Sequence, residues 1–199
     1  MKKYIEDTIK YYDETAKEYF EEWHKFEYPF PDIFLGYLKP NAKILELGCG
    51  TGRDSLYFKN KGYEVVPIDA SSELCKIASK VLDIEVCPMN FLDIDFENEF
   101  DGVFATASLL HLDDDDLIDV LKKVSKSLKF GGIAYVSFKY GDGERQSDGR
   151  FFNDMNEARF RDICKETPEL EIIKIYEESS YEGYRPFINF FLRKREVTC

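Results

Sequence analysis

The sequence has few of the groups that bind metals or form disulfides. It has two histidines, His24 and His111, far apart in the chain. Its five cysteines are odd in number, form no Cys-x-x-Cys pair, and stand at positions 49, 75, 87, 164 and 199. This usage fits neither a zinc site nor a disulfide framework. The acidic run 113–116 is typical of a helix start, where carboxylates complement the helix dipole. We therefore predict no metal site.

Long apolar runs are also missing. No run approaches the roughly 18 residues that a membrane-spanning helix requires. The N-terminal residues Met-Lys-Lys-Tyr-Ile-Glu-Asp contain no apolar signal-peptide segment. These features predict a soluble, cytoplasmic protein without a membrane partner.

Basic residues are outnumbered. The chain has 27 Lys and Arg against 39 Asp and Glu, which gives a formal net charge of −12. Affinity for nucleic acid depends on Lys and Arg neutralising phosphates. The charge balance therefore argues against DNA or RNA as a partner. Hydrophobic residues make up 44% of the 199 residues, enough for the core of one α/β domain of ordinary size.

The most informative segment is residues 43–54, Lys-Ile-Leu-Glu-Leu-Gly-Cys-Gly-Thr-Gly-Arg-Asp. It is typical of a buried strand that ends in a glycine-rich loop and then enters a helix. Glycines permit positive φ and close approach of a ligand to the backbone. The loop has neither the Gly-Lys-Ser/Thr of a phosphate loop nor the Gly-x-Gly-x-x-Gly of a dinucleotide site.

Apolar periodicity predicts alternating strands and helices along the chain. We expect strands near 43–47, 63–69, 84–87, 100–106, 133–138, 171–177 and 187–193. We expect helices over 1–24, 32–38, 52–60, from about 74, from 113 until Gly131-Gly132 stops it, and near 156–166. This pattern indicates a doubly wound, mostly parallel seven-stranded α/β sheet, Rossmann-like, with one antiparallel edge strand and extra N-terminal helices. We divide the chain into a helical cap, residues 1–40, and a ligand-binding domain, residues 41–199.

The motif Glu46-x-Gly48-x-Gly50-x-Gly52, with Asp69 at the end of the second strand, resembles the class I S-adenosylmethionine-dependent methyltransferases. The compact size and added N-terminal helix are similar to small bacterial methyltransferases, including those of the tellurite-resistance type. The resemblance implies the strand order 3-2-1-4-5-7-6. It also implies S-adenosylmethionine as cofactor and S-adenosylhomocysteine as product.

Several cofactor contacts follow from this resemblance. Asp69, which lies 19 residues after Gly50, would accept hydrogen bonds from the ribose hydroxyls, as the acid does in dinucleotide folds. Ala70 and Ser71 would lie beside the adenosine. Asn90 and Phe91 would meet the adenine amino group and ring, with Asn90 standing where Asp is common.

The methionine end of the cofactor has its own candidates. Glu46 would face the cofactor ammonium, and the Ala107 carbonyl region would help to hold it. Cys49 and Gly52 belong to the glycine loop. Tyr11, together with the nearby Tyr12 and Tyr19, would close over the cofactor.

Candidate catalytic residues are His111, after the fourth strand, and Tyr140, at the start of a long polar loop over 140–153. For His111 a structural hydrogen-bonding role is the alternative. A loop of this length suggests a functional lid. Arg145 and Arg150 in this loop, and the pair Tyr184-Arg185, could contact an anionic acceptor.

These observations predict an enzyme that transfers a methyl group from S-adenosylmethionine to a small-molecule acceptor, as a monomer or homodimer. Three alternatives remain open. They are an RNA or protein methyltransferase, an NAD-dependent oxidoreductase, and a catalytically silent cofactor-binding protein.

Overall fold

The computed structural model describes residues 1–179 and 185–195, and a six-stranded sheet forms its centre. The strands are β1 (Lys43–Leu47), β2 (Glu64–Ile68), β3 (Phe100–Ala105), β4 (Leu128–Lys139), β7 (Leu170–Glu177) and β8 (Phe187–Lys194). Their order is β2-β1-β3-β4-β8-β7. The pairs among β2, β1, β3 and β4 are parallel, and β8 is antiparallel to both neighbours. The doubly wound, mostly parallel fold is thus confirmed, with β7 and not the antiparallel β8 at the edge.

The predicted strand at 84–87 is wrong, which is why the sheet has six strands and not seven. Asp83 ends the preceding helix at φ 52°, and the Val86 N–H donates to Ser79 Oγ at 2.9 Å. This N–H group of the segment therefore donates to the preceding helix and not to a neighbouring strand. Just after the segment, Pro88 forms an isolated bridge with Asp69, the residue that follows β2, and proline has no N–H with which to extend a ladder.

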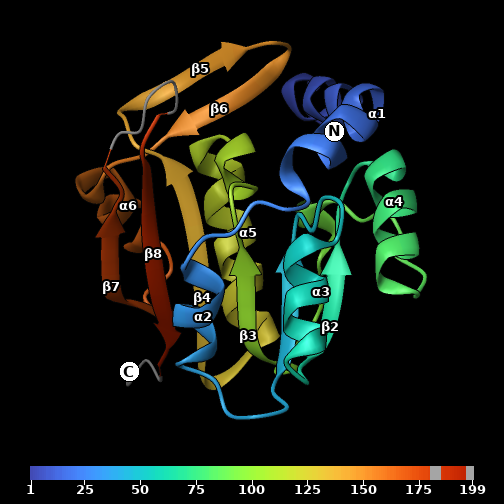
Figure 1. Ribbon diagram of the computed structural model, residues 1–199. Helices are drawn as coiled ribbons and strands as arrows, with labels where there is room; N and C mark the ends of the chain where they lie inside the picture. The colour runs from blue at the N-terminus through green and yellow to red at the C-terminus, as the bar shows by residue number, and fades with distance from the viewer. Residues whose placement is uncertain (180–184, 196–199) are drawn as a thin grey trace.

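Helices cover both faces of the sheet (Figure 1). One face packs against α2 (Phe30–Leu35) and α3 (Arg53–Asn60), and the other against α5 (Asp114–Ser127) and α6 (Glu157–Cys164). Because successive side chains along a strand point to opposite faces of the sheet, the hydrophobic core is divided into two layers. Ile44 and Phe104 belong to the first layer, whereas Leu45 and Val103 belong to the second. α4 (Ser72–Leu82) lies beside β2.

The segment 140–153 is mostly a β-hairpin, not the predicted polar loop. It consists of β5 (Gly143–Ser147) and β6 (Arg150–Asp154), paired antiparallel. Asp148 and Gly149 join the strands with φ values of 53° and 78°. An Asp-Gly pair with both φ values positive is the preferred two-residue hairpin turn, so the sequence did contain the signal.

The long N-terminal helix α1 (Lys3–Trp23) lies across the carboxyl ends of the parallel strands, between the hairpin and α4 (Figure 1). Asp13 of α1 accepts from Ser71 Oγ at 2.6 Å and from the Glu73 N–H at 3.1 Å, and so ties α1 to the start of α4. The prediction that Gly131-Gly132 stop α5 is wrong, because α5 ends at Ser127 and β4 begins at once. No helix within 1–179 and 185–195 is long and apolar enough to span a membrane.

Candidate functional site

A cavity opens at the carboxyl ends of β1, β2 and β3, beneath α1. Parallel sheets of this type bind ligands at this edge. Predicted cofactor residues that line the cavity are Gly48, Gly50, Asp69, Ala70, Ser71, Asn90, Phe91 and Ala107. The predicted catalytic residue His111 lines it too. Segments from four different loops are therefore brought together around one space.

The glycine loop leaves β1 with little room for side chains. The N–H groups of Gly48 and Cys49 both donate to the Ile68 carbonyl, at 2.8 and 2.9 Å, which folds the loop toward β2. Gly48 has φ 76°, and a Cβ atom there would lie 2.4 Å from Ser108 Cβ. A Cβ atom on Gly50, at φ 54°, would come within 3.3 Å of the Tyr19 ring. The loop requires glycine at both positions for conformation and for space.

Asp69 sits at the end of β2, where its carboxylate connects the loop to α4. Oδ2 accepts from the Gly50 N–H and Oδ1 from the Ser71 N–H, both at 2.9 Å. Burial raises the pKa of this carboxyl, and these two N–H groups oppose the rise. The Ala70 N–H also donates to this carboxylate. Because a carboxylate can accept about four hydrogen bonds, Asp69 can still accept from a ligand hydroxyl.

Asn90 and Phe91 border the cavity at the start of a short 3₁₀ segment, η1 (Phe91–Asp93). Asn90 Oδ1 accepts from the Leu92 N–H at 2.9 Å and so caps this turn. The Phe91 ring lies against the glycine loop, with Cζ 3.3 Å from the position of a Cβ on Gly48. The pair presents an amide and an aromatic ring on one side of the cavity.

The charge of the lining indicates which ligands fit. Asp69 is a carboxylate, and the described residues of the lining include no Lys or Arg. A negative site without a basic side chain suits a ligand with hydroxyls and a positive charge better than a pyrophosphate. The residues present therefore fit S-adenosylmethionine, whose ribose and sulfonium have these properties.

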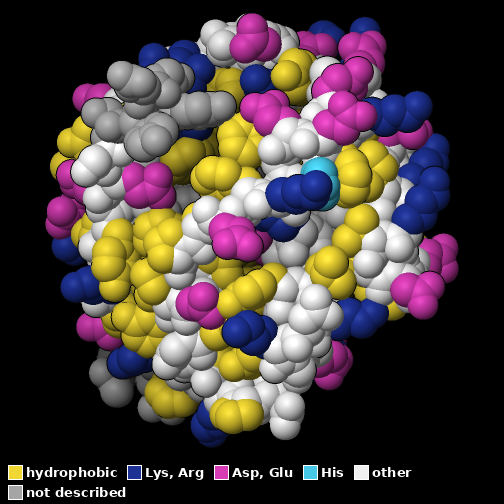
Figure 2. Space-filling model, in the orientation of Figure 1, with side chains coloured by type: hydrophobic (Ala, Val, Ile, Leu, Met, Phe, Trp, Pro, Cys, Tyr) yellow, Lys and Arg dark blue, Asp and Glu magenta, His cyan; other side chains and the backbone are white. Residues whose placement is uncertain are grey.

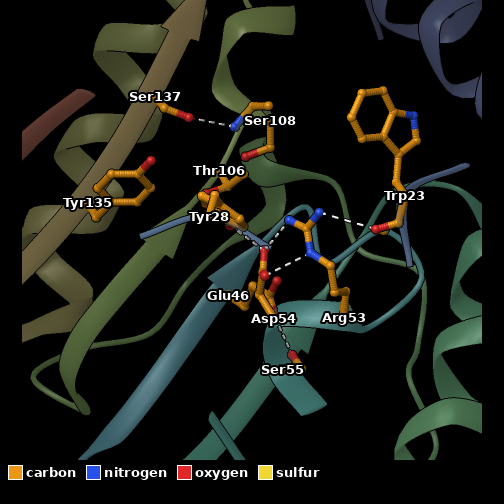
Figure 3. Close-up of polar contacts among 12 residues, drawn as sticks. Trp23, Tyr28, Glu46, Arg53, Asp54, Ser55, Thr106, Ser108, Tyr135 and Ser137 are labelled. Atoms are coloured by element: carbon orange, nitrogen blue, oxygen red, sulfur yellow. Dashed lines mark hydrogen bonds and ion pairs between the residues drawn. The ribbon is translucent and has the colours of Figure 1, made fainter. Parts of the chain in front are cut away.

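Glu46 lies outside this lining, in a buried polar network behind the glycine loop (Figure 3). It accepts a hydrogen bond from Ser55 Oγ, and burial raises the pKa of its carboxyl, reinforced by the nearby Asp54 carboxylate. Arg53 donates to both oxygens of Asp54, at 2.9 and 2.8 Å, and Tyr28 Oη donates to Asp54 at 2.7 Å. This network joins β1 and the start of α3 to the segment between α1 and α2.

Other predicted residues also lie away from the cavity. The Cys49 side chain is buried beside α4, and Gly52 begins α3 with φ 82°. Tyr11 faces a second hollow between α1 and the hairpin. Tyr140 is 42% exposed at the base of the hairpin. Tyr184 lies outside the described residues.

Of the three tyrosines expected to close over the cofactor, Tyr12 and Tyr19 line the cavity and Tyr11 does not. Tyr12 Oη lies 2.9 Å from His111 Nε2, and His111 Nδ1 lies 2.6 Å from the Phe151 carbonyl oxygen of β6. His111 is 9% exposed. Helical spacing predicts that Tyr12 and Tyr19 share a face of α1, but it does not tell which tyrosine faces the cavity.

The arginines of the hairpin lie next to this pair. Arg145 donates to Asp154 Oδ2 at 2.7 Å, and Arg185 donates to the same oxygen at 2.6 Å. The Arg150 guanidinium stacks over the Tyr11 ring at 4.1 Å, and its nearest described carboxylate is Asp148 at 3.7 Å. Arg145 is therefore neutralised by a close ion pair, whereas Arg150 is held by aromatic rings and by a hydrogen bond to the Tyr12 hydroxyl.

Known proteins resemble both the sequence and the fold. Residues 44–132 match the family described as "Methyltransferase domain". An uncharacterized methyltransferase of Staphylococcus carnosus (strain TM300) is 30% identical over 61% of this chain and 59% of its own length. The cypemycin N-terminal methyltransferase of a Streptomyces species is 31% identical over 63% and 55%. The chain thus spans little more than half the length of these two relatives.

Among solved structures, the Burkholderia thailandensis 1,6-didemethyltoxoflavin-N1-methyltransferase, with bound 1,6-didemethyltoxoflavin and S-adenosylhomocysteine, matches with a TM-score of 0.77. It is 19% identical, and the match covers 94% of this chain and 85% of that one. This likeness shows the fold. Together with the domain match, it shows that residues 44–132 resemble a methyltransferase domain and that the chain has the fold of an S-adenosylmethionine-dependent methyltransferase.

Proposed function

We propose that this protein transfers the methyl group of S-adenosylmethionine to a small-molecule acceptor. The observation that carries the proposal is the convergence of the glycine loop, Asp69 and Asn90-Phe91 on one cavity with His111. When bound, S-adenosylmethionine supplies a methyl group on a positively charged sulfur, which an acceptor lone pair can attack.

The described residues have distinct parts in this proposal. Asp69 would accept from a ribose hydroxyl, and Asn90 and Phe91 would contact the adenine. Gly48 and Ala107 would border the methionine end. The chain's contribution is to align the two reactants and exclude water, which is how proteins accelerate such transfers.

The enclosure of the site supports a small acceptor. Residues 1–40 would act as a cap, because α1 contributes Ile5, Ile9, Tyr12 and Tyr19 to the lining. On the face in Figure 2, basic side chains are interspersed with acidic ones and form no continuous basic surface. The Burkholderia thailandensis protein of similar fold was solved with bound 1,6-didemethyltoxoflavin.

Calorimetric titration with S-adenosylhomocysteine tests the proposal, with NAD as the control ligand. We expect micromolar binding of S-adenosylhomocysteine and none of NAD. Binding of NAD alone would favour the oxidoreductase alternative. Binding of S-adenosylhomocysteine without turnover of any small acceptor would favour a silent binding protein or a macromolecular substrate.

A further inference from the structure

The hydrogen bonds of His111 fix where its proton lies. The Phe151 carbonyl can only accept, so the His111 Nδ1 that lies 2.6 Å from it must carry the hydrogen. In the neutral ring, Nε2 then has a lone pair and accepts. Because Nε2 lies 2.9 Å from Tyr12 Oη, the Tyr12 hydroxyl donates its hydrogen to His111.

The surroundings keep this histidine neutral. Burial, together with the positive charges of Arg150 and Arg145, lowers the pKa of His111 to about 4, although the hydrogen bond to the Phe151 carbonyl raises it in part. The imidazole therefore accepts a hydrogen bond from Tyr12 but is a poor sink for a proton at neutral pH.

This arrangement sets the hydrogen-bonding character of the cavity wall. Tyr12 and His111 both line the cavity, beside Ala107 and Ser108. The Tyr12 hydrogen is committed to His111, and the Arg150 guanidinium donates toward the Tyr12 oxygen. The oxygen therefore has one remaining lone pair, and no hydrogen, to offer a ligand. A ligand group that meets Tyr12 Oη must itself be a hydrogen-bond donor.

Resting on the proposed function, we propose that Tyr12 Oη accepts a hydrogen bond from an N–H group of the methyl acceptor. The acceptor is then a neutral nitrogen compound, such as an N–H heterocycle or an aromatic amine. Tyr12 touches this substrate, whereas His111 is a positioning residue that fixes the direction of the Tyr12 hydroxyl.

The proton balance favours nitrogen over oxygen. A neutral nitrogen compound attacks the methyl carbon with its lone pair while it keeps its N–H, and the electron pair of the broken carbon–sulfur bond stays on sulfur. The methylated product is a cation that loses its N–H proton to water afterwards. A hydroxyl acceptor would have to lose its proton during the transfer, and the neutral, cation-flanked His111 is poorly suited to take it.

Matched fragments test this hydrogen bond directly. Imidazole and 1-methylimidazole share a nucleophilic nitrogen, but only imidazole has an N–H; aniline and N,N-dimethylaniline form a second such pair. We expect the wild-type protein to bind each N–H fragment about tenfold more tightly than its partner, roughly the value of one hydrogen bond. Binding is measured by NMR titration with and without S-adenosylhomocysteine.

Two variants test whether Tyr12 causes the preference for N–H fragments over their N-methylated partners. Tyr12→Phe should reduce the preference to near unity while S-adenosylhomocysteine affinity stays within about twofold. Tyr4→Phe is the matched control, because Tyr4 is on the same helix and its hydroxyl bonds to Asp116 outside the cavity. It should keep the full preference. Equal binding within the wild-type pairs, including no binding of either fragment, would overturn the proposal.

A second readout needs no ligand. ¹⁵N NMR at pH 7 should show His111 neutral with hydrogen on Nδ1, and His24→Gln removes the signals of the other histidine. Hydrogen on Nε2, or a charged ring, would contradict the proposal. Failure of S-adenosylhomocysteine to bind would instead overturn the proposed function, so the two failures are distinguishable.

Discussion

Two walls of the cavity differ in how their residues are spaced along the chain. The loop wall, made of Gly48, Gly50 and residues 69–71, comes from one β-α-β unit and is built largely from backbone groups. The helix wall, made of Tyr12, Tyr19 and His111, joins residues up to 99 positions apart through side-chain contacts. The first wall is therefore visible in a local motif, whereas the second exists only once α1 has docked.

The largest expected effect is on the loop wall. Gly48→Ala should destabilise the fold by roughly 2–5 kcal/mol, because it combines left-handed strain with overpacking against Ser108. Gly149→Ala is the matched control, since Gly149 has φ 78° and nothing within 4 Å of an added Cβ. It should cost only the strain, about 1–2 kcal/mol. Urea unfolding measures both, and equal losses would show that the contact with Ser108 is unimportant.

Asp69→Ala tests ligand binding by the same wall. Loss of the hydrogen bond to the ribose should weaken S-adenosylhomocysteine by about 2–3 kcal/mol, close to 100-fold. Calorimetry measures the affinity. A thermal melt without ligand shows separately how far the variant is destabilised by losing the hydrogen bonds of Asp69 to Gly50 and Ser71. Unchanged affinity would mean that the ribose lies elsewhere.

The helix wall should respond to pH. Since the folded pKa of His111 is about 4 and its ordinary value is 6.5, the unfolded chain binds more protons between these values. Stability should therefore fall as pH falls, with a His111 contribution of about 2 kcal/mol between pH 7 and pH 5. The measurement is the difference in unfolding free energy between wild type and His111→Gln at both pH values. A difference that does not change with pH would contradict a buried, neutral His111.

The smallest expected effect concerns the docking of α1. Asp13→Ala removes the hydrogen bonds to Ser71 and Glu73 and should cost about 1 kcal/mol. Asp7→Ala, which breaks only an exposed pair with Lys3 on the same helix, should leave stability unchanged. Fluorescence of Trp23, the single tryptophan, follows α1 during unfolding. Identical unfolding curves for the two variants would show that Asp13 does not anchor α1.

Most of the strands and helices could be predicted from the apolar periodicity of the sequence and from the positions of glycine and proline. The strands at 43–47 and 187–193 were predicted within a residue because apolar runs mark buried strands. The predicted strand at 84–87 is wrong because the N–H groups of Ile84 and Val86 donate to Ser79 of the preceding helix, a local contact that apolar periodicity does not reveal. The hairpin at 143–154 was missed although its Asp148-Gly149 turn is a local signal, because the polar strands around it show little apolar alternation.

The sequence by itself determined the α/β class, the glycine loop and the register that places Asp69 beside it. These features depend on backbone conformation and on residues adjacent along a β-α-β unit. Only the tertiary structure decided that Tyr12 faces the cavity while Tyr11 does not, and that Glu46 is buried behind the loop. Those outcomes depend on how α1 and the hairpin pack over the sheet, because a side chain's partner across the fold is set by docking geometry and not by its neighbours in the chain.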